Sequence, residues 1–139
     1  MGTTIQPQLS AKNKYWIERH RYYELKHFCL QYPLWKKAYS EIDGFSKDSA
    51  SVIKVAKMGT IHNPTEKYAE EKIVYLDKIW LIEKVAFDTD SELHNYILKA
   101  VTEGLSYDYL KSKLEIPCCK DIYYDLYRKF FWSLDKSRN

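Results

Sequence analysis

The sequence predicts an all-α fold, a multi-helix bundle that ends in a helix-turn-helix. Three observations lead to this prediction. Apolar residues recur at intervals of three and four, which is the spacing of one helix face. Helix-capping residues precede several of these stretches. Only 4 Gly and 4 Pro occur in 139 residues, of which 45% are hydrophobic, so the chain is long and apolar enough to bury a core without disulfides.

The chain is expected to begin with a helical arm over residues 1–62 that is rich in aromatic and basic residues. Its main helix is predicted at Tyr15–Gln31, because aromatic and apolar residues repeat there every seven positions, which is two helical turns. The two repeating rows are Tyr15, Tyr22, Cys29 and Trp16, Tyr23, Leu30. Pro33 interrupts this helix and can open a second one over Leu34–Ile42.

Two polar stretches, Asp43–Ser51 and Gly59–Pro64, then break the pattern. The segment between them, SVIKVAKM, fits a short helix and an extended strand equally well. We therefore place the boundary of the arm here, and expect a helical domain over residues 63–139.

The domain opens with the strongest helix signal in the sequence. Asn63 is a good N-cap, Pro64 fits the first helical position, and Glu66 stands three residues after the cap. The helix is expected to run to Phe87 or Asp88. It carries two apolar rows, one of Ala69, Ile73, Leu76, Trp80 and Phe87, the other of Tyr68, Tyr75, Ile79, Ile82 and Ala86. A helix that is apolar over so much of its surface is expected at the centre of the bundle, with Trp80 buried.

A shorter helix is expected next, over Ser91–Thr102. Thr89 and Glu92 have the spacing of a capping box before it, and Gly104 is suited to end it.

The last third of the chain, from Glu103 to Lys136, has the pattern of a helix-turn-helix. Ser106 can cap a helix that runs to Leu114, Ile116-Pro117 turns the chain, and a second helix is expected from Lys120 to Leu134. The inward positions of the pair are Leu110, Leu114, Tyr123, Leu126 or Tyr127, Phe130 and Leu134. The outward positions of the second helix are Lys120, Asp121, Tyr124, Asp125, Arg128 and Lys129. In such a pair the first turns of the second helix are exposed, as in helices that enter the DNA major groove.

These residues carry a resemblance to known families. The motif Gly104-Leu105-Ser106-Tyr107, followed by Leu110, Leu114 and Ile116, resembles the region-four helix-turn-helix of sigma factors. Over residues about 60–139, the runs HNPTEKYAEEK, VTEGLSY and IPCCKDIYYDLYRKFFWSL resemble phage late-transcription regulators of the ArpU and RinA kind. The connection before Tyr123 is about two residues longer than in sigma factors, and Lys120-Asp121-Ile122 replaces their Thr or Ser. The resemblance implies a phage or prophage protein that binds DNA and catalyses no reaction.

Double-stranded DNA is therefore the expected partner, with RNA polymerase or another host protein as a further one. We expect Tyr124, Arg128 and Lys129 to read the DNA. Phosphates would be bound by Lys111, Lys113 and Lys120. Asp121 and Asp125 lie on the same predicted face and would repel phosphate. The competing interpretation is a helical hairpin that only closes the bundle.

A second function class stays open, a phage-encoded inhibitor or adaptor that binds a host protein, for example of the anti-defence or anti-CRISPR type. Residues 63–104 contain nine acidic and five basic residues, and an acidic helix can imitate a phosphate backbone. The aromatic and basic stretch of the arm could stack unpaired bases, bind a protein or serve as a core helix. Its helical spacing favours the core helix.

Other classes of function have no support in the sequence. The candidate metal ligands His20, His27, Cys29, Cys118 and Cys119 lack the spacing of a zinc site, so no metal or cofactor is expected. No catalytic residue set is visible, which predicts a non-enzyme. No stretch approaches the roughly 18 apolar residues of a membrane span. The three cysteines are an odd number, typical of a reducing compartment, so we expect the host cytoplasm. The oligomeric state is not specified.

Overall fold

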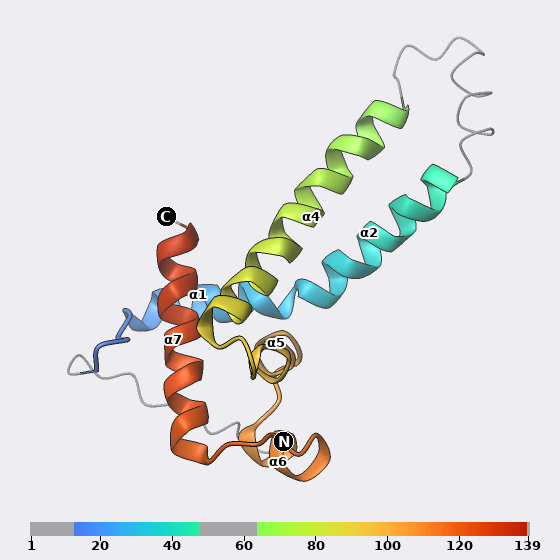
Figure 1. Cartoon of the computed structure of the whole chain (residues 1–139). Helices are drawn as coiled ribbons and strands as arrows, with labels where there is room; N and C mark the ends of the chain where they lie inside the picture. The colour runs from blue at the N-terminus through green and yellow to red at the C-terminus, as the bar shows by residue number, and fades with distance from the viewer. Residues whose placement is uncertain (1–12, 48–63, 139) are drawn as a thin grey trace. The chain divides into compact units, whose positions relative to one another are not determined.

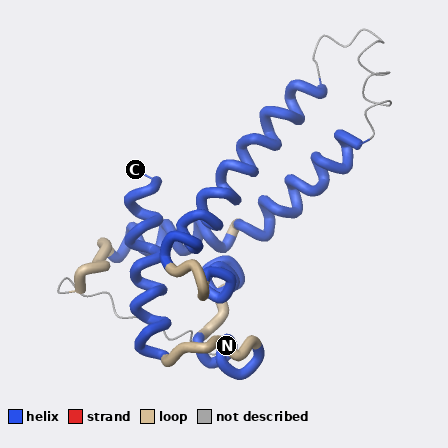
Figure 2. The backbone as a smooth tube through the Cα atoms, viewed as in Figure 1, coloured by secondary structure: helices blue, strands red, loops and turns tan. Residues whose placement is uncertain are grey.

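The structure, a computed structural model, describes residues 13–47 and 64–138, with side chains at residues 13–42 and 66–138. Every regular element in these ranges is a helix and none is a strand, as Figures 1 and 2 show. The all-α prediction is confirmed. The expected cap at Asn63, the segment SVIKVAKM and the expected boundary between residues 62 and 63 lie outside the described residues.

The helices form two compact units, which are described separately. One unit contains residues up to Gln31 together with those from Leu81 onward. It comprises α1 (Arg19–Leu30), the last turns of α4 (Pro64–Thr89), α5 (His94–Glu103), α6 (Tyr107–Lys113) and α7 (Lys120–Arg138). The other unit, Tyr32–Trp80, comprises α2 (Tyr32–Lys47) and the preceding turns of α4.

Helix α1 begins four residues later than the sequence predicts, because Glu18 caps it. The Glu18 carboxylate accepts hydrogen bonds from the backbone N–H groups of His20 (2.9 Å) and Arg21 (3.1 Å). These backbone hydrogen bonds stabilise the charged form and lower the pKa of Glu18. The predicted start at Tyr15 is thus wrong, while the helix end at Leu30 is one residue from the predicted end.

Only one of the two aromatic rows of α1 lies inside the core. Tyr22 and Cys29 are buried, together with Leu25 and Phe28, whereas Trp16 and Tyr23 of the other row are exposed. The rows differ by one residue, which is a rotation of about 100° around a helix. Burial of four side chains on one face makes α1 a core helix, as the spacing favoured.

The buried face of α1 packs against α5 and α7. The hydroxyl groups of Tyr22 and Tyr127 form a buried hydrogen bond of 2.7 Å. At the edge of the same interface, Arg21 Nε donates to Asp135 at 2.6 Å. Helix α7 contributes its whole inner face to this core: Tyr123, Tyr127, Phe130, Phe131 and Leu134. The sequence predicted this face apart from Phe131.

Helix α4 begins at the predicted residue and ends one residue after Asp88. The face that it turns toward the core, however, is not the predicted one. The row predicted to centre on a buried Trp80 is exposed, and Trp80 itself is 58% exposed. The second row faces inward, since Ile79, Ile82 and Ala86 are buried. In the unit Tyr32–Trp80, α2 lies along α4 (Figure 1). There the ammonium groups of Lys72 and Lys78 lie 5.2 and 5.4 Å from the ring centres of Tyr39 and Trp35.

The connection from α4 to α5 is a turn that Thr89 does not cap. Thr89 is the last residue of α4, is buried, and donates its hydroxyl to the Val85 carbonyl (2.7 Å). The Asp90 carboxylate instead accepts from the N–H groups of Glu92 (2.8 Å) and Leu93 (2.9 Å). These bonds close the turn before α5, which begins at His94, three residues after the predicted Ser91, and whose N-cap Leu93 makes no side-chain hydrogen bond. The predicted Thr89 capping box is wrong.

Candidate nucleic-acid interface

Helix α6 is a short helix with a well-formed cap and a buried anchor. The Ser106 hydroxyl accepts a hydrogen bond from the N–H of Tyr109 (3.2 Å), as its position in the sequence predicted. Before it, Gly104 ends α5 in the left-handed conformation (φ 70°) and donates its N–H to the Ala100 carbonyl (3.0 Å). Leu110 is completely buried on the inner face of α6. Lys111 and Lys113 are exposed.

The connection between α6 and α7, residues 114–119, is fixed from the inside. Its Ile116 is fully buried and donates its N–H to the Leu110 carbonyl (3.0 Å). The Tyr107 hydroxyl donates to the Cys118 carbonyl at 2.7 Å. Glu115 adopts a left-handed backbone (φ 55°), which no other non-glycine residue does in the described ranges. These contacts hold the start of α7 beside the start of α6.

The first turns of α7 are exposed beyond this connection. Lys120, Asp121 and Asp125 are exposed, and Tyr124 is half-buried, with the Lys120 ammonium 5.7 Å from the centre of its ring. Burial raises the pKa of the Cys118 thiol, and the positive charge of the nearby Lys111 partly opposes this rise. We refer to Lys111, Lys113, Lys120, Asp121, Tyr124 and Asp125 together as the α6–α7 face.

Two residues expected to bind DNA have partners inside the chain. The Arg128 guanidinium donates to Asp125 (3.0 Å), and its side chain is only 19% exposed. Arg128 Nε is buried and has no hydrogen-bond partner among the described residues. Lys129 Nζ donates to the carbonyl of Thr89 (3.2 Å), which ends α4. A cation at a helix C-terminus stabilises the helix, so Lys129 has a structural role here.

The charge of the α6–α7 face is mixed. It contains three exposed lysines and two exposed aspartates, and one of these aspartates, Asp125, holds Arg128. Exposed apolar groups lie close by in the sequence, Tyr109 on α6 and Ile122 on α7. This surface can bind phosphate through its lysines and can also contact an apolar group.

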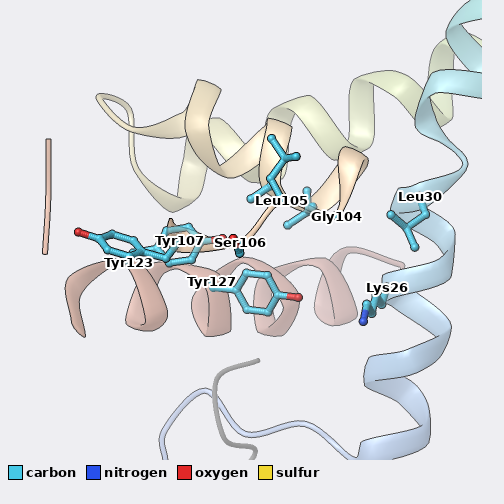
Figure 3. A pocket seen from close by; sticks show the side chains of 10 residues that line it. Lys26, Leu30, Gly104, Leu105, Ser106, Tyr107, Tyr123 and Tyr127 are labelled. Carbon is cyan, nitrogen blue, oxygen red and sulfur yellow. The ribbon is translucent and has the colours of Figure 1, made fainter. Parts of the chain in front are cut away.

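The unit also contains a small cavity between α1, the α5–α6 connection and α7. Figure 3 shows Tyr123 and Tyr127 projecting from α7 toward it, and Lys26 and Leu30 lining it from α1. Its volume of about 30 Å³ accommodates one or two water molecules and no organic ligand. The cavity therefore adds no binding site to the α6–α7 face.

Among the residues that the structure describes, no three His, Cys, Asp or Glu side chains gather in one place. Cys29 is buried, which raises the pKa of its thiol, while Cys119 is exposed. Within the described ranges, no helix has the length and apolar character needed to cross a membrane.

Comparisons with known proteins add no family. No family model, curated protein or solved structure matches the chain. The likeness to phage regulators and sigma factors therefore depends on the short motifs in the sequence alone.

Sequence reasoning placed the exposed residues of the α6–α7 face but missed the partners of Arg128 and Lys129. Asp125 is three residues from Arg128, so this ion pair had a sequence signal in the helical i, i+3 spacing. The bond from Lys129 to Thr89 spans 40 residues and had none. The exposed apolar row of α4 was visible in the sequence but was assigned to the core.

Proposed function

We propose that this chain binds duplex DNA through the α6–α7 face. The observation that carries the proposal is the connection between the two helices. Because Ile116 is buried and Cys118 accepts the Tyr107 hydroxyl, the first turns of α7 are held in a defined position. They are exposed and carry Lys120 and Tyr124. A short helix followed by a longer one with exposed first turns is the arrangement that helix-turn-helix proteins use in the major groove.

In this proposal the three lysines of the face contact phosphates, while Tyr124 lies over the bases. Arg128 and Lys129 contribute only if they leave Asp125 and Thr89, so we assign them a smaller part than the sequence suggested. The resemblance to phage late-transcription regulators supplies the proposed setting. In that setting we propose that the chain acts as a transcription regulator in the host cytoplasm, with RNA polymerase or another host protein as a further partner.

The test is a fluorescence titration of labelled duplex DNA at two salt concentrations. Lys120→Ala and Lys111→Ala should each lower the slope of log affinity against log salt by about 0.9 for each phosphate that the variant no longer neutralises. Tyr124→Ala should reduce the preference for a selected site more than the overall affinity. Lys37→Ala is the matched control, since Lys37 is an exposed lysine of α2 outside this face.

The aspartates of the face provide an internal check. Asp121→Asn and Asp125→Asn should strengthen non-specific binding, because each removes a negative charge that faces phosphate. Asp125→Asn also releases Arg128 from its ion pair. If neither variant binds duplex DNA better than the parent chain, the proposal is wrong.

The second candidate function is binding of a host protein by the same surface, as in a phage inhibitor or adaptor. The observation that favours it is the exposure of Ile122 and Tyr109, since phosphate contacts do not need apolar side chains. An inhibitor of this kind would show no salt-dependent duplex binding near physiological ionic strength. Its activity would be insensitive to Lys120→Ala but would fall with Ile122→Asp.

A further inference from the structure

Aromatic and basic side chains gather where the residues before α1 meet the last turns of α7. The ring of Tyr15 packs edge-on against that of Trp132, with the ring centres 5.4 Å apart. The Lys14 ammonium lies 4.9 Å from the centre of the Tyr15 ring, and the Lys136 ammonium lies 3.5 Å from that of the Trp132 ring. Trp16 follows Tyr15 directly and is 44% exposed. We refer to Lys14, Tyr15, Trp16, Trp132 and Lys136 as the aromatic–basic cluster.

The apolar part of the cluster that faces solvent consists of rings and not of aliphatic side chains. Asn13 holds the first two rings in place, because its side-chain oxygen accepts from the N–H of Tyr15 (2.8 Å) and its carbonyl accepts from that of Trp16 (3.0 Å). The aliphatic neighbours Ile17 and Leu134 are both buried. Exposed aromatic rings offer flat faces on which unpaired bases stack, whatever the base.

The charges around the cluster favour an anionic partner. Residues 13–24 contain three Lys or Arg and two acidic side chains, and residues 131–138 contain two and one. All three acidic groups are engaged inside the chain. One caps α1, and the other two, Glu24 and Asp135, lie 2.7 and 2.6 Å from nitrogens of Arg21. The two lysines of the cluster are exposed and make no ion pair within the described residues, so their charges are available to phosphates.

We propose that the aromatic–basic cluster binds single-stranded nucleic acid. Unpaired bases stack on Trp16 and on the ring pair of Tyr15 and Trp132, while Lys14 and Lys136 bind phosphates. Proteins that bind single strands without sequence preference combine aromatic rings and basic groups in this way. The contacts of the two lysines with rings are weak at an exposed site, so a phosphate and a base can replace them. The buried face of α1 serves the core, so base stacking involves the residues before this helix. The inference is independent of duplex binding by the α6–α7 face.

A fluorescence-anisotropy titration of labelled oligo(dT), about 15 nucleotides long, tests the cluster in the full chain. Trp16→Ala should weaken binding about fivefold or more, the usual loss when an aromatic ring under a base is removed. Trp16→Phe keeps a ring face and should retain most of the affinity, whereas Trp16→Leu should bind as weakly as Trp16→Ala. Helicity by circular dichroism should not change, because Trp16 lies outside the helices. Tyr109→Ala is the matched control: Tyr109 is 45% exposed outside the cluster, and its loss should change the dissociation constant less than about twofold.

Salt dependence and an abasic strand separate phosphate contacts from stacking. Lys14→Ala and Lys136→Ala should each lower the slope of log affinity against log salt by about 0.7 for each phosphate that the variant no longer neutralises. Lys99→Ala, at an exposed lysine of α5, should leave the slope unchanged. An abasic strand of the same length should bind about fivefold more weakly than oligo(dT), or weaker still, and Trp16→Ala should cause no further loss.

Two more comparisons identify the strand and separate the two proposals. Oligo(U) beside oligo(dT) distinguishes RNA from DNA, and the tighter of the two identifies the strand. Lys120→Ala should leave single-strand binding unchanged, and Trp16→Ala should leave duplex binding unchanged, so either proposal can fail without the other. The proposal is overturned if neither strand binds at about 50 mM salt, if the abasic strand binds as tightly as oligo(dT), or if Trp16→Ala and Tyr109→Ala have equal effects.

Discussion

Replacing Tyr127 by Phe removes one hydroxyl from a buried hydrogen bond without removing the ring. In the folded chain, the Tyr22 and Tyr127 hydroxyl oxygens are 2.7 Å apart. After the change, the Tyr22 hydroxyl stays buried and loses this partner. An unsatisfied buried polar group costs about 1–3 kcal/mol, so we expect the free energy of unfolding to fall by that amount. Tyr22→Phe should have a similar effect.

The double variant decides whether the hydrogen bond is the cause. When both hydroxyls are absent, no polar group of the pair remains unsatisfied. The rings keep their contacts with Phe131, whose centre lies 5.1 Å from the ring of Tyr22 and 5.0 Å from that of Tyr127. The double variant should thus be less destabilised than the sum of the two single variants, by about 1 kcal/mol or more.

Urea unfolding followed by circular dichroism measures the free energy of unfolding of the parent chain, of the two single variants and of the double variant. The slopes of the transitions should be alike, so that midpoints report stability. Tyr109→Phe is the control, because Tyr109 is exposed on α6, and it should change the free energy by less than about 0.5 kcal/mol. Additivity of the two single variants within about 0.3 kcal/mol would show that the hydroxyls do not interact, and the packing of α1 on α7 described above would be wrong.

Three further changes test other parts of the structure. Burial raises the pKa of Tyr22 from near 10 to about 12, so the stability that Tyr22 contributes is fully present below about pH 10 and declines as pH rises toward 12, by about 1.4 kcal/mol per unit. Burial also raises the pKa of Tyr123 and Tyr127, which add to this decline, so Tyr22→Phe should make the decline less steep by about the Tyr22 share in unfolding measured across that range. Phe130→Ala, at a fully buried side chain, should cost about 3–5 kcal/mol in urea unfolding, whereas Leu34→Ala, at an exposed one, should stay within about 0.5 kcal/mol. Gly104→Ala should cost about 1 kcal/mol in the same assay, because its backbone is left-handed; an unchanged midpoint would contradict that conformation.

The sequence predicted those parts of the fold that depend on neighbouring residues. Ser106 and Gly104 act as the caps that their positions indicated, since a cap is formed within one turn of the helix. The inner face of α7 followed from its periodicity, because only one of its faces is apolar. The start of α1 was missed because Glu18 is not among the common capping residues, although its carboxylate fulfils the same function.

The rotation of α4 could not be predicted in the same way. Both of its rows are apolar, and periodicity does not indicate which row meets the core. That choice depends on tertiary packing, in which Ile79, Ile82 and Ala86 are buried while Trp80 is exposed. For the candidate site, the exposed positions of α7 were predictable from the same helical period. The engagement of Lys129 with Thr89 was not, because it joins residues far apart in the sequence.

The contacts between α1 and α7 have a consequence for how the chain folds during synthesis. The Arg21–Asp135 ion pair joins residues 114 positions apart, and the Tyr22–Tyr127 hydrogen bond joins residues 105 positions apart. At typical rates of about 5–20 residues per second, α1 leaves the ribosome roughly 5–20 seconds before its partner is made. During that interval the buried face of α1 lacks the part of the core that α7 supplies. The unit can therefore close only after α7 has been made, and α1 stays accessible to chaperones and proteases until then.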